Sequence, residues 1–162
     1  MCTSRAERNL VPAPALAAVR RLAVRERGWV RDLEAWLLDS GQANPTPSRE
    51  GLGAIGRRVR NELVALEDYS ASRGVRVQAP GRLPIPRRDA SPATLGRRLR
   101  HLRFVLRRLR REVGDVIAEA HARGDLAAAI RLRTLARLHG DADRILVSLQ
   151  EQCGGATRGL AA

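Results

Sequence analysis

Eight prolines divide the sequence into long proline-free stretches, and their placement limits the possible folds more than any other feature. They stand at positions 12, 14, 45, 47, 80, 84, 86 and 92. Proline inside a helix removes a backbone hydrogen bond and clashes with the preceding turn, so we expect helices only between these positions. Pro47 and Pro92 each follow a Thr or Ser, which is typical of a helix start, and Gly41, Gly74 and Gly124 provide helix stops. The sequence therefore predicts four helices, at about residues 15–40, 47–73, 91–123 and 125–152.

Apolar residues recur every three or four positions within these stretches, which indicates amphipathic helices. The clearest series is Leu95, Leu99, Leu102, Leu106, Leu109, Val113, Val116 and Ala120. Weaker series comprise Val19, Leu22, Trp29, Leu33 and Trp36, then Leu52, Ile55, Val59, Leu66 and Tyr69, and finally Leu135, Leu138, Ala142, Ile145 and Leu149. No segment shows the period of two that a strand requires. We predict an all-α fold, an antiparallel four-helix bundle with one long crossover from the second helix to the third.

The predicted bundle occupies residues 15–152 as one domain, because 162 residues suit a single core. Residues 1–14 and 153–162 flank it and are expected to be flexible. The Pro- and Gly-rich link at 74–91, if mostly extended, can span the roughly 40 Å length of the second helix, although a shorter connection with a surface loop is an alternative. Cys2 and Cys153 stand near opposite ends and indicate free thiols in a reducing cytoplasm. No apolar run approaches the roughly 20 residues of a membrane span or resembles a signal peptide, so we expect a cytoplasmic protein.

The positive charge is concentrated in one quarter of the chain. The sequence has 30 basic residues, all of them arginine, against 17 acidic ones, for a net charge of +13. Residues 70–111 hold 13 arginines and one acid, Asp89, and so carry +12. Such a segment attracts a polyanion, and nucleic-acid phosphates are the first candidate. An acidic protein partner or a second subunit is the alternative, as is a solvated face whose arginines pair with acids on other helices. Membrane binding is the least favoured, because the apolar series is committed to the bundle.

The four aromatic residues limit how nucleic acid would be held. Trp29, Trp36, Tyr69 and Phe104 all fall on or beside the apolar series, so we expect them in or near the core. Base stacking needs exposed aromatic rings. The sequence therefore favours contacts with phosphate and with duplex shape over contacts with bases.

Catalytic motifs are weak. Gly51-Leu52-Gly53-Ala54-Ile55-Gly56 matches the G-x-G-x-x-G fingerprint of dinucleotide sites. That fingerprint works only after a buried strand, and residues 41–50 cannot form one, so we interpret these glycines as sites of close helix packing or as a first helical turn softened by glycine. Neither cysteine has a nearby histidine, and no serine lies in a nucleophile elbow. Catalysis is the least favoured class of function, and no cofactor is expected.

Two carboxylates interrupt otherwise apolar series, Glu26 in the first helix and Glu62 in the second. Inward carboxylates of a helical bundle can bind metal, but the di-iron pattern also needs Glu-x-x-His on two helices, and the required histidines are missing. We expect Glu26 and Glu62 to pair with arginines such as Arg131. His121 and His139 are expected to be solvated or hydrogen-bonded rather than ligands.

The stretch Val116–Asp125 and the following Asp143–Leu149 are similar to the closing helices of many chains of the Dps family, the DNA-protecting ferritin-like proteins of starved bacteria. With its helix order and long second-to-third connection, most of the sequence resembles that family. The resemblance implies a ferritin-like fold and assembly into a hollow homo-oligomeric shell. DNA contacts in the family often use a basic N-terminal tail, whereas here Glu7 dilutes Arg5 and Arg8.

The metal site of the family does not carry over. Trp36 and Gly41 match two positions of the family's His-Trp-Asn-x-x-Gly stretch, but Ala35 replaces the iron-binding histidine. Glu67 matches the carboxylate near the end of the second helix, but Leu63 replaces the carboxylate upstream of it. The resemblance therefore implies a degenerate or absent ferroxidase centre.

Together these features predict a non-enzymatic, self-associating helical bundle that binds a polyanion, with nucleic-acid backbone favoured. One alternative is a scaffold protein that docks an acidic partner or its own subunits. A second is a Dps-type iron-binding protein that uses the degenerate set Glu26, Glu62 and Glu67. The predicted anion-binding residues are Arg97, Arg100, Arg103, Arg107, Arg108 and Arg111.

Overall fold

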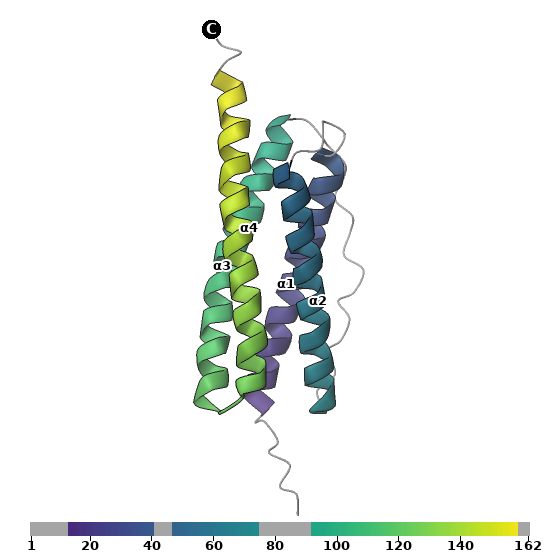
Figure 1. The fold of residues 1–162 in the computed structure, drawn as a ribbon, viewed down its shortest axis with the longest axis vertical. Helices are drawn as coiled ribbons and strands as arrows, with labels where there is room; N and C mark the ends of the chain where they lie inside the picture. The colour runs from purple at the N-terminus through teal and green to yellow at the C-terminus, as the bar shows by residue number, and fades with distance from the viewer. Residues whose placement is uncertain (1–12, 41–46, 75–91, 159–162) are drawn as a thin grey trace, which may run out of the picture.

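A computed structural model describes residues 13–40, 47–74 and 92–158 of the chain. These residues form four helices and no strand, so the predicted all-α class is confirmed (Figure 1). The helices are α1 (Ala13–Ser40), α2 (Pro47–Ser72), α3 (Pro92–Ala122) and α4 (Leu126–Arg158). α2 and α3 begin at the predicted prolines, whereas α4 continues past its predicted end near residue 152. Residues 1–12, 41–46 and 159–162 lie outside the described residues, as do residues 75–91 of the predicted crossover at 74–91.

Each helix packs on two others. α1 packs on α2 and α3, and α4 packs on the same two helices. Within the described ranges, the backbones of α2 and α3 do not contact each other, nor do those of α1 and α4. The four helices lie side by side along one long axis (Figure 1). Because α3 packs only on α1 and α4, no described helix covers its outer side.

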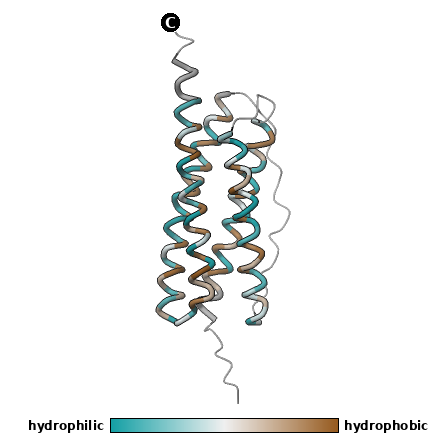
Figure 2. The backbone as a smooth tube through the Cα atoms, in the orientation of Figure 1, coloured by the Kyte–Doolittle hydropathy of each residue, from teal (hydrophilic) through white to brown (hydrophobic). Residues whose placement is uncertain are grey.

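The apolar series forms the core, as predicted. Most of its members are buried in one cluster between the four helices, and brown and teal alternate along each helix in Figure 2. Burying such a side chain stabilises the fold by about 1.5–3 kcal/mol relative to leaving it exposed. The buried members on α3 are Leu99, Leu102, Leu106, Leu109, Val113 and Ala120. This packing directs one side of α3 into the bundle and the opposite side to solvent.

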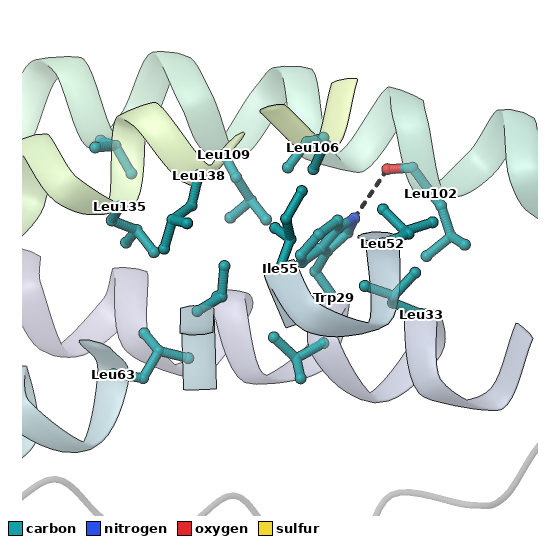
Figure 3. Close-up of a cluster of buried hydrophobic side chains, with 14 of the residues drawn as sticks. Trp29, Leu33, Leu52, Ile55, Leu63, Leu102, Leu106, Leu109, Leu135 and Leu138 are labelled. Carbon is teal, nitrogen blue, oxygen red and sulfur yellow. Dashed lines mark hydrogen bonds between the residues drawn. The ribbon is translucent and has the colours of Figure 1, made fainter. Parts of the chain in front are cut away.

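Two tryptophans of α1 are hydrogen-bonded to the backbone of α3. The indole of Trp29 donates to the carbonyl of Leu102, and that of Trp36 donates to the carbonyl of Leu95, each at 3.1 Å. Both indoles are buried, and Figure 3 shows the first bond among the leucines. The two donors and the two acceptors are each seven residues apart, about two helical turns. These bonds therefore fix both the rotation of α3 and its axial position against α1.

The turn between α3 and α4 has the predicted stop and cap. Gly124 adopts a φ of +70°, a conformation that favours glycine. The Asp125 carboxylate accepts a hydrogen bond from the amide of Ala128 at 3.1 Å and so caps α4. The same oxygen accepts a 2.6 Å bond from the Tyr69 hydroxyl of α2. Burial of the ring, followed by this bond, raises the pKa of Tyr69 to about 12. The turn is thus tied to α2 as well as to α4.

The glycines of the G-x-G-x-x-G stretch lie inside α2, where close packing explains two of them. A Cβ atom at Gly56 would lie 3.2 Å from Leu33 of α1, and one at Gly51 would lie 3.3 Å from Ile145 of α4. Larger side chains at these two positions would crowd the neighbouring helices. The interpretation as packing glycines is confirmed for Gly51 and Gly56, whereas a Cβ atom at Gly53 would make only ordinary contacts at 3.7 Å.

Candidate polyanion-binding surface on α3

α3 carries eight arginines, and the rotation of the helix divides them into two groups. Its leucines occupy the inner side, so the angular position of each arginine relative to these leucines decides whether it flanks the core or faces outward. Arg98 and Arg103 are half-buried along the flanks. The exposed arginines are Arg97, Arg100, Arg107, Arg108, Arg110 and Arg111.

The two flanking arginines are held by acids of the neighbouring helices. Arg98 contacts Asp39 of α1 at 2.5 Å. Arg103 donates to the Asp143 carboxylate and to the Gln150 amide oxygen of α4, at 2.9 Å each. With its side chain only 23% exposed, Arg103 is the least available of the six predicted anion-binding residues. Arg98 and Arg103 therefore follow the alternative in which arginines pair with acids on other helices.

The outward arginines are held weakly or not at all. Arg107 lies 3.8 Å from Asp143, and Arg108 lies 3.4 Å from Glu112 one turn further along α3. Exposed pairs of this kind contribute only about 0–1 kcal/mol, so an incoming phosphate can replace them. Arg97 donates a 3.3 Å bond to the neutral hydroxyl of Thr94.

Arg100, Arg110 and Arg111 make no ion pair with any acid in the described part of the chain. We define the arginine face as the outward strip of Arg97, Arg100, Arg107, Arg108 and Arg111. At about 1.5 Å per residue, this strip extends over about 21 Å of helix. One strand of duplex DNA presents a phosphate about every 3.4 Å, so roughly six phosphates fit along that length. The structure thus brings five of the six predicted residues onto one surface.

Phe104 corrects the expectation that every aromatic residue lies in or near the core. It is 68% exposed, whereas both tryptophans are buried. Residue 104 follows Leu102 by two positions and precedes Leu106 by two, and at 3.6 residues per turn this puts it on the far side of the helix from both. Phe104 therefore lies in the middle of the arginine face, and its spacing from the leucines was the signal that could have found it.

The three predicted metal candidates each have a basic partner. Glu62 faces Arg131 at 3.9 Å, as predicted, and Glu67 pairs with Arg27. The sequence suggested an arginine partner for Glu26, but in the structure Glu26 pairs with His139. Within the described ranges, no group of three or more His, Cys, Asp or Glu side chains is placed to hold a metal ion.

The Glu26–His139 pair lies at the centre of the bundle. Glu26 Oε2 and His139 Nε2 are 3.1 Å apart, and both side chains are fully buried. The Trp29 ring meets the imidazole edge-on, with centroids 6.2 Å apart. Glu26 Oε1 and His139 Nδ1 have no hydrogen-bond partner. Sequence analysis missed this pair, although His139 lies in the apolar series of α4, four residues after Leu135 and three before Ala142.

A surface hollow of about 310 Å³ opens between α1 and α3. Its charged lining is Arg21, Arg25, Glu112, Asp115 and Glu119. Three carboxylates against two guanidiniums give it no preference for an anion. The arginine face therefore remains the candidate site.

Comparison of the chain with protein-family models, with curated proteins and with solved structures found no match. Among the described helices, none carries an apolar stretch of the length that a membrane crossing requires. The function must therefore be inferred from the residues of this chain, and above all from those of the arginine face.

Proposed function

We propose that this chain is a cytoplasmic, self-associating helical-bundle protein that binds a polyanion through the arginine face of α3, and that the polyanion is the phosphate backbone of nucleic acid. The observation that carries the proposal is the row of outward arginines held by no acid or by exposed, weak pairs. Arg100 and Arg111 are exposed and unpaired within the described residues, and the Arg108 side chain is 69% exposed despite its contact with Glu112.

Backbone binding follows from the chemistry of the face. A guanidinium is permanently charged and can donate two parallel hydrogen bonds to one phosphate. Each phosphate that is neutralised releases condensed counterions, so affinity falls as salt rises. Contacts with phosphates do not read the base sequence, so we expect nucleic acids of different sequence to bind with similar affinity.

We further propose that adjacent helices run antiparallel and that the α2–α3 link is the long crossover. Two sets of contacts support this arrangement. On α1 and α3, Trp29 and Trp36 meet Leu102 and Leu95, so the order along one helix is reversed along the other. On α2 and α4, Gly51 lies against Ile145 whereas Glu62 lies against Arg131. If every neighbouring pair is reversed, α2 and α3 point the same way, and the connection between them must return along the bundle.

Self-association is supported by an apolar pair at the start of α4. Leu126 and Ile130 are both exposed and stand one helical turn apart. We expect size-exclusion chromatography with light scattering to give a mass above that of one chain, and Ile130→Asp to lower it. A wild-type mass of one chain at every concentration tested contradicts this part of the proposal.

The test of polyanion binding is an equilibrium titration of a labelled duplex of arbitrary sequence at several salt concentrations. We expect log affinity to fall linearly with log salt, by about 0.9 for each phosphate contacted. Arg107→Ala combined with Arg108→Ala removes two contacts and should reduce that slope by about 2.

The matched control is Arg57→Ala combined with Arg58→Ala. These arginines are also exposed, but they lie on α2, which does not contact α3. The control removes the same charge and should leave the slope close to wild type. Equal losses in both double variants would mean that net charge, and not the arginine face, binds the duplex. Absence of binding to both the duplex and a single-stranded oligonucleotide at low salt would contradict the nucleic-acid proposal, and binding of polyglutamate instead would indicate an acidic protein partner.

A further inference from the structure

Phe104 is the exposed aromatic side chain of this protein. The chain has four aromatic residues, and all of them lie in the described ranges. Trp29 and Trp36 are buried with their indoles hydrogen-bonded, and Tyr69 is half-buried against the α3–α4 turn. Phe104 makes no ring contact or cation–π contact within the described residues. Its ring is therefore free to receive a ligand.

The surroundings of Phe104 on the helix are basic. Its neighbours one turn away are Arg100 and His101 on one side and Arg107 and Arg108 on the other, all of them exposed. Residues three or four apart on a helix have Cβ atoms about 5–6 Å apart, so these four side chains surround the ring. No other large exposed apolar side chain of the described residues lies on this strip.

This arrangement does not match the centre of a protein interface. Aromatic residues and arginine are both enriched in such interfaces, but the anchors there lie in well-packed pockets, and no other large exposed apolar side chain of the described residues lies beside Phe104. An aromatic ring flanked by arginines is instead the combination that holds a single strand, with a base stacked on the ring and phosphates on the guanidiniums. In a duplex the bases are already stacked and paired, so the ring has no free base to receive.

We propose that Phe104 is a stacking platform for an unpaired base and that the arginine face therefore prefers single-stranded nucleic acid to duplex. Arg100, Arg107 and Arg108 hold the phosphates on either side of the stacked base. This inference rests on the proposed polyanion binding and narrows its ligand. In this proposal Phe104 distinguishes single strand from duplex, which the arginines alone do not do.

The experiment is a fluorescence-anisotropy titration of oligothymidylate of about 15 nucleotides, alongside a duplex of equal length, at one low salt concentration. We expect the wild-type protein to prefer the single strand. Phe104→Ala should lower the ratio of single-strand to duplex affinity by about 5- to 150-fold, the range that corresponds to one stacked base. Phe104→Tyr, which keeps an aromatic face, should retain the preference.

Two further variants separate stacking from other roles. Phe104→Leu keeps an apolar side chain without an aromatic face and should lose the preference as Phe104→Ala does. Val64→Ala, which shortens an exposed apolar side chain of α2, should change neither affinity. Because Phe104 is mostly exposed, its variants should fold as wild type, which circular dichroism checks.

Three results would overturn the proposal. Unchanged preference in Phe104→Ala means that no base stacks on the ring. Preference retained in Phe104→Leu means that the contact is apolar and not aromatic. Loss of self-association in Phe104→Ala, measured by light scattering, means that the ring meets a second copy of the chain. If neither probe binds at low salt, polyanion binding itself fails, whereas duplex binding with no role for Phe104 removes only the stacking platform.

Discussion

Replacing either member of the buried Glu26–His139 pair should destabilise the protein far more than replacing both. Glu26 lies on α1 and His139 on α4, two helices whose backbones are not in contact, so the side chains meet across the middle of the bundle. Both are fully buried, and each already has one polar atom without a partner. Glu26→Leu leaves the imidazole with no partner, and His139→Leu leaves the carboxylate with none.

The burial of both side chains sets the size of the effect. Removal of one partner from a buried pair costs about 3–5 kcal/mol, because the remaining group has lost water and gained nothing in return. The double variant, Glu26→Leu with His139→Leu, leaves no buried polar group and should be close to wild type or more stable by about 1–4 kcal/mol. For a chain of this length, each single replacement corresponds to a fall in Tm of roughly 6–20 °C.

Urea unfolding followed by circular dichroism measures all four proteins of this double-mutant cycle. Protein concentration must be the same throughout, since self-association changes apparent stability. We expect strong coupling: the loss of stability in the double variant should be far smaller than the sum of the losses in the two single variants. Additive losses, or single variants within about 1 kcal/mol of wild type, would refute the reasoning that the two groups satisfy each other in the core.

The remaining predictions concern α2 and the α3–α4 turn. Tyr69→Phe should make the free energy of unfolding depend less on pH in the alkaline range. The folded-state pKa of Tyr69 is raised from 10.0 to about 12, so the stabilisation that this side chain provides is present below pH 10 and lost as pH rises towards 12. Urea unfolding across that range measures the difference, and parallel profiles for the two proteins contradict the role of the bond to Asp125. Gly53→Ala should raise the free energy of unfolding by up to about 1 kcal/mol through helix propensity, since the new methyl makes only ordinary contacts at 3.7 Å. Gly56→Leu should lower it by roughly 1–3 kcal/mol through overpacking, and the two glycine variants must change the urea midpoint in opposite directions. Gly124→Ala should cost about 1–2 kcal/mol because of its positive φ, and an unchanged midpoint would show that the turn adapts without strain.

Much of the fold could be predicted because its determinants are local. Proline positions and the recurrence of leucine every three or four residues act within a single helix. The second and third helices accordingly begin at Pro47 and Pro92 as expected. Gly124 and Asp125 formed the expected stop and cap for the same reason. The exposure of Phe104 was also a local property, since its distance from Leu102 along the helix decides its side, and the prediction of a position near the core was wrong.

The candidate site was less predictable because charge pairing joins distant parts of the chain. Arg98 meets Asp39, 59 residues away, and Arg103 meets Asp143, 40 residues away. A count of acids near the arginines in the sequence finds neither partner. The availability of each guanidinium depends instead on which neighbouring helix it faces.

The sequence by itself determined that the chain would form amphipathic helices and that the segment 70–111 would carry most of the net charge, because helix period and charge are properties of consecutive residues. Only the tertiary structure decided which arginines are neutralised and which face solvent, and that Glu26 would meet His139. The physical reason is that these contacts depend on the rotation and axial position of whole helices. Core packing sets both, together with the indole bonds of Trp29 and Trp36 to α3.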